Sequence, residues 1–577
     1  MRNTTVVILL LSYIFISCKS FGVDIIKNGQ ANAVIVLKKE DKDGIKIANI
    51  LNEYIEKVSG TKLSISTKPG RYNLHLIHND NKFRSRLANF SEDAFLIISD
   101  GTNITIYSNS SLGLEYGVYH FLESYLNVTW LMPTHYGEYF EKKETISIPN
   151  IDRVFSPSFK GRQLSPIDIN LKDDIHYWGR RNKLNYNPAF HHNMNSFFAE
   201  KEIKNYNKSL FPKYNGKIYY PKDKSDINWN PDFKSNLFFE HSVDVVGKYL
   251  EKNPTASSFS LGINDSRKSS DGASQGKNYL GLNSYSNEYY AWVDKLITAV
   301  NQKKPNIKYG LLAYYNVSEP PSLNFENKSQ IIPFITFERL RWTNNTFKSE
   351  DQKLTSQWKT KVNELGWYDY YYGRSYLFPR EYFGLTSDYL KWANSNNVNY
   401  YYAEIYPNWG EGPRYWILSK LLWDVNLNEK ELLKEWCTKA VGQDASPYLE
   451  KFYLMIDEIW IKDISNSQWF NRNVAFLPFN DLGYINVINE SKISELNKLM
   501  TLVQEKARNS NPSQVDRARL LRNMWELYKS AFEEVSKNSK YKNIKDLNGS
   551  TKFMNTLETL KKNPLHYNTY YLIKSNL

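Results

Sequence analysis

The sequence predicts an α/β protein whose central part is a (β/α)8 barrel of the TIM type, flanked by an N-terminal α/β sandwich domain and a C-terminal helical domain. Three observations lead to this class. Short apolar or aromatic runs alternate with longer helical stretches over residues 155–428, strands and helices alternate in residues 24–150, and strand patterns largely stop in residues 429–577. At 577 residues the chain is too long for one compact core.

Residues 1–18 have the features of a bacterial lipoprotein signal peptide. Arg2 supplies the positive start, residues 6–16 are apolar, and Ser17 precedes Cys18. This apolar run is too short to span a bilayer as a helix. The lipobox-like ending implies a lipid on Cys18 and a place in the cell envelope, on the surface or periplasmic face of the outer membrane. Phe15 stands where a lipobox usually has Leu, so plain secretion is the alternative.

The N-terminal domain, residues 24–150, shows strand patterns at residues 33–37, 72–77, 94–98 and 104–107 and helical patterns at residues 43–58 and 112–125. The first helix places Ile47, Leu51, Tyr54 and Val58 on one face and ends at Gly60. Strands and helices in this order predict a sheet covered by helices.

The barrel is predicted from seven strands, at residues 160–164, 183–189, 257–263, 309–315, 331–337, 367–372 and 399–402. An eighth is expected between residues 193 and 221. Helices fit between several of these strands, for example at residues 237–250 and 288–300. The helical domain is predicted from periodic patterns at residues 429–441, 447–461, 491–508, 513–536 and 554–562.

Composition favours a carbohydrate partner and disfavours nucleic acid. Aromatic residues make up 15% of the chain, with 43 Tyr and 15 Trp, and such side chains offer flat surfaces with a polar edge. The net charge of +13 is spread along the chain without a basic stripe, so we expect no nucleic-acid site, although the charge suits acidic glycans. No cofactor and no metal are expected.

Residues 397–424 are the most informative segment for function. A predicted strand leads to Glu404. Aromatic residues on both sides of it in the sequence are predicted to form a rim around the carboxylate: Tyr401, Tyr402, Tyr406 and Trp409. A carboxylate among aromatic surfaces at the C-terminal end of a barrel strand is typical of enzymes that act on sugars. The alternative is a buried Glu404 that pairs with Arg414.

A second candidate pair follows the strand at residues 257–263. Asn264 and Asp265 stand where this strand opens into a long loop, so both side chains are predicted to reach the mouth of the pocket. The alternative is an Asx turn, because Asn-Asp-Ser is good turn chemistry.

Further polar and aromatic residues near strand ends are candidates for substrate binding: Arg162, His191, His192, Asn193, Glu338, Trp342, Asp369, Tyr370 and Tyr372. Structural alternatives exist for several of them. Glu338 suits an ion pair with Arg339 or Arg341, Arg162 suits an internal ion pair, and the tyrosines suit core packing. The two histidines lack the spacing of a metal site.

Three motifs, SLGLEYGVYHFLESYLNVTWLMP, SFSLGINDS and AEIYPNWGEGPRYWILSKLLWD, resemble glycoside hydrolase family 163, formerly the bacterial domain of unknown function DUF4838. The resemblance covers roughly residues 30–460. It implies an endo-β-N-acetylglucosaminidase that cuts the chitobiose core of complex N-glycans. More distantly, the N-terminal domain and barrel resemble family 20 hexosaminidases and family 67 α-glucuronidases.

The family 20 resemblance implies a retaining mechanism in which the acetamido oxygen of the substrate is the nucleophile. Asn264 would then orient the acetamido group and Asp265 would be the general acid. Glu404 would bind sugar hydroxyls, or would itself be the acid. Family 20 has a carboxylate where this chain has Asn264.

Two other functions compete with this one. One is an exo-acting, α-glucuronidase-like enzyme on uronic-acid polysaccharide, for which the arginines near strand ends are suited: Arg162, Arg339, Arg341 and Arg374. The other is a lipid-anchored glycan-binding protein without catalysis.

Overall fold

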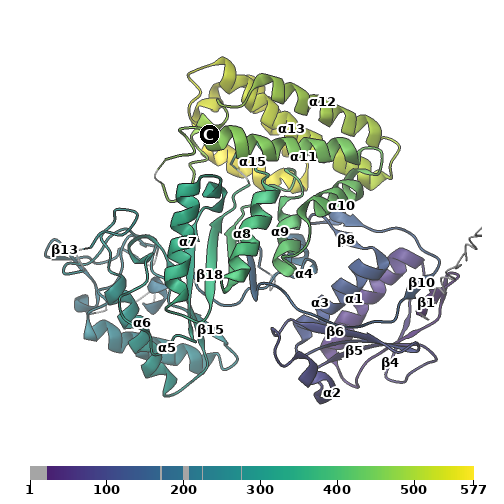
Figure 1. Cartoon of the computed structure of the whole chain (residues 1–577), viewed down its shortest axis with the longest axis horizontal. Helices are drawn as coiled ribbons and strands as arrows, with labels where there is room; N and C mark the ends of the chain where they lie inside the picture. Colours follow the sequence, from purple (N-terminus) through teal and green to yellow (C-terminus); the bar gives the residue numbers. More distant parts are fainter. Residues whose placement is uncertain are drawn as a thin grey trace, which may run out of the picture. The chain divides into compact units, whose positions relative to one another are not determined.

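The computed structural model describes residues 22–168, 172–198, 207–223, 225–273, 276–373, 375–472 and 474–577. Cys18, the signal predicted before it, and Arg374 lie outside the described residues. The described chain forms two compact units, one of residues 22–128 and 140–156 and the other of residues 129–139 and 157–577 (Figure 1).

The first unit contains a six-stranded mixed sheet in the order β11-β6-β7-β5-β3-β4. Its strands are β3 (Val34–Val36), β4 (Ser64–Ser66), β5 (Asn73–His78), β6 (Phe95–Ser99), β7 (Asn103–Ser108) and β11 (Asp152–Phe155). A smaller sheet pairs β1 (Val23–Lys27) with β2 (Gln30–Ala31) and β10 (Ile146–Ile148). Helix α2 (Asn81–Arg84) is short.

Two longer helices of the first unit have the ends that the sequence predicts. Helix α1 (Lys42–Ser59) begins after Asp41, whose carboxylate accepts a hydrogen bond from the Gly44 amide at 2.7 Å, and ends at Gly60 with φ of 79°. Helix α3 (Ser111–Leu126) packs against β5, β6 and β7. The alternation of strands and helices predicted for this part of the chain is confirmed.

The second unit is built on a parallel six-stranded sheet in the order β12-β19-β18-β17-β16-β15. The strands are β12 (Gly161–Ser165), β15 (Ser258–Ser260), β16 (Lys308–Ala313), β17 (Ile331–Phe337), β18 (Leu365–Tyr370) and β19 (Val398–Glu404). One face of the curled sheet encloses an aromatic cluster that includes Phe190, Phe334, Tyr368, Tyr400 and Tyr402.

A closed eight-stranded barrel is not what the described residues form. The segment predicted as a strand at residues 183–189 is not a strand; single bridges join Asn185 to Arg162 and His192 to Gly262. The amide of Ala189 donates to Ser258 Oγ at 3.0 Å, and the amide of Asn193 donates to Gly262 O at 2.9 Å. Residues 185–193, here called the closing segment, therefore contact both β12 and the chain around β15, which are the two edges of the sheet.

The eighth strand was expected in residues 193–221. The described part of this region contains two short strands, β13 (Lys213–Tyr214) and β14 (Lys217–Ile218), which pair with each other outside the large sheet. The helices beside the sheet are α4 (Asp174–Arg181), α5 (Asn236–Lys252), α6 (Ser286–Asn301), α7 (Asn345–Lys359), α8 (Phe383–Ser395) and α9 (Arg414–Trp423).

The last part of the chain is helical, as predicted. It contains α10 (Glu429–Val441), α11 (Ser446–Glu458), α12 (Glu490–Ala507), α13 (Pro512–Lys537), α14 (Thr551–Leu560) and α15 (Pro564–Asn576), of which α15 was not predicted. Helices α11, α12 and α13 lie side by side (Figure 1). Within the described residues, we find no helix with the length and apolar character that crossing a membrane requires.

Candidate active site

A cavity of about 220 Å³ lies where the strands of the second unit end. Asp265, which follows β15, and Glu404, the last residue of β19, both line it. The rest of its lining is largely aromatic and includes His192, Tyr314, Tyr315, Tyr368, Tyr370, Tyr372 and Phe476. The carboxyl ends of parallel strands are where barrel enzymes place their active sites, so the cavity is the candidate active site.

Glu404 is half-buried and accepts a hydrogen bond from the Tyr372 hydroxyl. Burial, followed by the negative charge of Glu404, raises the pKa of Tyr372 well above its usual value. Burial also raises the pKa of Tyr370, and Glu404 adds to the rise. Both hydroxyls therefore keep their protons at neutral pH, and that of Tyr372 donates to the carboxylate.

Asp265 is exposed at the cavity, whereas its neighbour Asn264 is buried and lies outside the cavity lining. The Asn264 amide donates to Asn195 Oδ1 and to Trp229 O, each at 3.0 Å. The prediction that both side chains reach the pocket is therefore wrong for Asn264, because its donors hold the surrounding loops together. The structure gives it no place from which to orient an acetamido group.

His191, His192 and Asn193 were predicted to bind substrate, and of these only His192 lines the cavity. Its Nδ1 hydrogen bonds to Ile263 O, and the Asn193 side chain donates to Ser260 O at 2.8 Å. Burial lowers the pKa of His191 to about 4, so its ring, which packs 4.9 Å from the Tyr402 ring, is neutral at pH 7. These residues join the closing segment to the chain around β15.

Four other predicted binding residues lie outside the cavity lining. The Arg162 guanidinium donates to Lys183 O and Phe159 O, both at 2.8 Å. Trp342 donates to Asp351 at 2.8 Å, and Asp369 accepts from the Tyr401 hydroxyl at 2.7 Å. Glu338 is a buried ion-pair partner, as its structural alternative proposed, but with Arg380 at 2.7 Å rather than with Arg339 or Arg341.

The aromatic rim predicted around Glu404 is divided in the structure. Tyr406 lies with its ring 5.6 Å from that of Tyr372, next to the cavity. Tyr402 is buried in the aromatic cluster inside the sheet. Trp409 packs edge-on at 4.8 Å against Trp178 and does not line the cavity.

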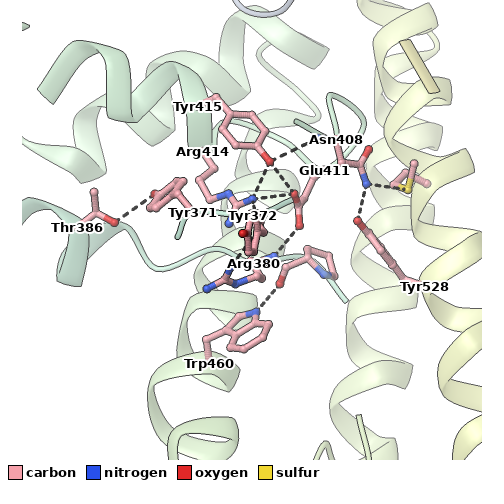
Figure 2. A network of polar contacts seen from close by, with 12 residues as sticks. Tyr371, Tyr372, Arg380, Thr386, Asn408, Glu411, Arg414, Tyr415, Trp460 and Tyr528 are labelled. Carbon is pink, nitrogen blue, oxygen red and sulfur yellow. Dashed lines mark hydrogen bonds and ion pairs between the residues drawn. The ribbon is translucent and has the colours of Figure 1, made fainter. Parts of the chain in front are cut away.

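A buried polar network holds the chain that follows β18 (Figure 2). Arg380 and Arg414 both donate to the carbonyl oxygen of Tyr372, at 3.1 and 3.0 Å. Glu411 accepts from the Arg380 amide at 2.7 Å and pairs with Arg414 at 3.2 Å. The alternative in which Arg414 pairs with Glu404 is therefore wrong. The network fixes the backbone of the residue whose hydroxyl contacts Glu404.

A comparison with models of protein families assigns the chain to a family. Residues 132–454 match the model of DUF4838, described as a domain of unknown function. The chain belongs to the DUF4838 family. A comparison with curated proteins found no match.

Solved structures with the fold of this DUF4838 protein include glycoside hydrolases. A family GH115 4-O-methyl-α-glucuronidase, BtGH115A, with specificity for decorated arabinogalactans, is 13% identical with a TM-score of 0.56, over 93% of this chain and 76% of the other. The family 89 enzyme CpGH89 of Clostridium perfringens, in complex with GlcNAc-α-1,4-galactose, is 13% identical with a TM-score of 0.51, over 91% and 65%. The DUF4838 chain thus spans about two thirds of the family 89 structure.

The sequence analysis missed several residues that line the cavity of the DUF4838 protein. Tyr314 and Tyr315 end the predicted strand at residues 309–315, so listing aromatic residues at all strand ends would have found them, whereas Tyr368 stands near the start of the strand predicted at residues 367–372. Phe476 comes from a loop in the helical part of the chain and carries no signal in the sequence. No group of three or more His, Cys, Asp or Glu residues suited to a metal ion occurs in the described parts of the chain.

Proposed function

We propose that the protein is a glycoside hydrolase, specifically an endo-β-N-acetylglucosaminidase of family 163 that cleaves the chitobiose core of complex N-glycans. The observation that carries the proposal is the pair of carboxylates, Asp265 and Glu404, in one tyrosine-lined cavity at the strand ends. Most glycosidases use a pair of Asp or Glu side chains that flank the glycosidic bond. The fold shared with glycoside hydrolases is consistent with it.

In this proposal the two carboxyl groups have different tasks. Asp265, exposed at the cavity, donates a proton to the leaving glycosidic oxygen. The acetamido oxygen of the substrate attacks the anomeric carbon from the other face as that bond breaks. Water then opens the cyclic ion with retention and gives a proton back to the Asp265 carboxylate. Glu404, held by the Tyr372 hydroxyl, accepts the acetamido N–H and stabilises the positive charge. Because Asn264 lies outside the lining, Glu404 and the tyrosine hydroxyls replace it in orienting the acetamido group.

The first test is incubation of the mature protein with a complex-type N-glycoprotein, followed by mass spectrometry of the released sugars. Glycans that end in a single N-acetylglucosamine, with one N-acetylglucosamine left on the protein, are the expected products. Asp265→Ala and Glu404→Ala should each lower the rate by about 10²- to 10⁴-fold or more without unfolding the protein. Two variants with near wild-type rates would refute the site.

The separate roles of the carboxyl groups can be tested with leaving groups of different acidity. Asp265→Asn should retain most activity on a 2,4-dinitrophenyl glycoside, because a good leaving group needs no proton. Glu404→Gln should lose activity on poor and good leaving groups alike, since charge stabilisation is needed for both. The opposite pattern would make Glu404 the acid.

A second candidate is an α-glucuronidase-like enzyme on uronic-acid polysaccharide. The observation that favours it is Arg341, which lines a cavity next to the candidate active site together with Glu350 and forms no salt bridge with another described residue. Release of free uronic acid from glucuronoxylan would establish this function. Binding of glycan without any product would instead support a binding protein.

We also propose that the chain is anchored to the cell envelope by lipid on Cys18. Expression in a bacterium and partition into Triton X-114 tests this. The wild-type chain should enter the detergent phase and Cys18→Ala should remain in the aqueous phase. Equal partition of both chains would favour plain secretion.

A further inference from the structure

A second cavity, of about 150 Å³, shares a wall with the candidate active site. Tyr314, Tyr315 and Thr336 line both cavities. The residues specific to the second cavity include Tyr279, Leu280, Phe347 and Ala475. None of these was singled out by the sequence analysis, and the proposed reaction does not use them.

The shared wall has an unusual backbone. Tyr315 has a φ of 46°, in the left-handed region that residues other than glycine seldom adopt. Successive side chains of an extended strand point to opposite sides, but here the rings of Tyr314 and Tyr315 stack with centroids 3.7 Å apart. The turn in the backbone therefore presents two adjacent rings to the same space, and such deviations are concentrated at functional sites.

The outer wall is held in place by a buried amide. Asn278 is 6% exposed, and its side chain donates to Tyr315 O at 2.5 Å and to Ser318 Oγ at 3.2 Å. Its Oδ1 accepts from the Leu280 amide at 3.0 Å. The loop that carries Tyr279 is thus tied to the backbone of the shared wall, so the second cavity is formed before any ligand arrives.

The opposite wall is held by Arg341, which donates to Val474 O and Arg472 O, each at 2.7 Å, and lies 3.4 Å from the Phe347 ring centroid. Glu350 also lines this cavity, and its carboxylate acts on the Arg341 charge at longer range without forming a salt bridge. Aromatic faces beside hydrogen-bond donors are the combination that binds sugar rings, whose C–H groups stack while hydroxyls accept.

Size supports a joint site. Small-molecule pockets measure roughly 300–1,000 Å³, and each of the two cavities, at about 220 and 150 Å³, falls below this range. The combined volume of the two cavities, which share a wall, falls within this range. One ligand that spans both would lie over the stacked pair of tyrosines.

We propose that the second cavity is a sugar-binding subsite, so that the substrate is a glycan of at least two units that crosses Tyr314 and Tyr315. One unit lies beside Asp265 and Glu404, and the next lies against Tyr279 and Phe347. This inference rests on the proposed function for the position of the reacting bond. The binding of a second unit is a separate property that binding measurements test directly.

The experiment compares a free complex-type N-glycan with N-acetylglucosamine as ligands of the Glu404→Gln protein, with dissociation constants from saturation-transfer NMR. Tyr279→Ala removes an exposed ring from the wall, and Ala475→Trp fills the cavity. Tyr571→Ala is the matched control, since Tyr571 on α15 is 44% exposed and Tyr279 is 37% exposed.

Both cavity variants should weaken N-glycan binding at least about tenfold and change N-acetylglucosamine binding less than about twofold, while the control changes neither. Equal losses for both ligands, or no loss for the N-glycan, would overturn the subsite. Glycan that binds in this pattern but is not cleaved by the wild-type protein would retain the subsite and refute the proposed hydrolysis.

Discussion

The ion pair between Glu338 and Arg380 gives the sharpest stability prediction. The two side chains are 1% and 0% exposed, and Glu338 Oε1 lies 2.7 Å from Arg380 Nη2. The other carboxylate oxygen accepts a hydrogen bond from the Leu477 amide. Glu338→Gln keeps the shape of the side chain but removes the charge and one of the two acceptors.

Either orientation of the new amide would point its NH2 group at a donor, the guanidinium or the Leu477 amide. Breaking a buried ion pair by removing one partner costs about 3–5 kcal/mol. Arg380 keeps its bond to Tyr372 O at 3.1 Å and its position 4.5 Å from the Tyr376 ring. We therefore expect the lower end of that range, about 3 kcal/mol.

The assay is urea unfolding monitored by tryptophan fluorescence. The loss in the free energy of unfolding is the shift in the urea midpoint multiplied by the m-value. Asp244→Asn is the control, because Asp244 and Lys248 form an exposed pair at 2.7 Å on α5. An exposed pair contributes about 0–1 kcal/mol. If Glu338→Gln costs no more than this control, the ion pair does not stabilise the unit and the reasoning is refuted.

Three further changes have defined outcomes. Burial raises the pKa of Asp457 to about 6, so its folded carboxyl keeps a proton that the unfolded one has lost, and stability falls as pH rises from about 4 to 6. Asp457→Asn should therefore add about 3 kcal/mol at pH 7.5 and nothing below pH 4, as urea titrations at both pH values would show. Gly373→Ala would place its Cβ 1.8 Å from the Tyr415 hydroxyl and should cost about 1–3 kcal/mol, and an unchanged thermal midpoint would contradict this. Tyr372→Phe removes a hydrogen bond to a carboxylate, worth about 1.5–3 kcal/mol, so kcat/KM should fall about 10- to 100-fold with unchanged circular dichroism. A rate within twofold of wild type would exclude a catalytic role for that bond.

The strands of the large sheet could be predicted because their buried, aromatic runs stand out from the polar chain around them. The position of Glu404 at the end of β19 followed directly. The interpretation of Asn264 failed for a reason visible in the sequence. Neighbouring residues of an extended chain point to opposite sides, so Asn264 and Asp265 could not both reach one pocket without a turn of the kind found at Tyr315.

The partners of buried charges were beyond sequence reasoning. Glu338 and Arg380 are 42 residues apart, and Arg339 and Arg341 are nearer in sequence but contact other groups. Sequence distance therefore suggested the wrong arginines. The same holds for Phe476, which reaches the cavity from a loop far along the chain.

The predicted strand at residues 183–189 overlaps the irregular closing segment. Its composition explains the difference, since Asn185 and Asn187 favour turns and Pro188 has no amide to give to a ladder. One side-chain amide, that of Asn193, and one hydroxyl, that of Ser258, replace the ladder there together with isolated backbone bridges.

At the closing segment, residues 185–193, the edge strands of the large sheet are joined by isolated hydrogen bonds instead of a continuous ladder. Amide protons in residues 185–193 should exchange with solvent by local opening long before those of β16 to β19 do. No strand of the large sheet lies in the described part of residues 194–235, so a change of length there would interrupt none of the strands found. Homologous chains could therefore acquire new contacts with long glycans at this edge while the carboxylates stay on a rigid framework.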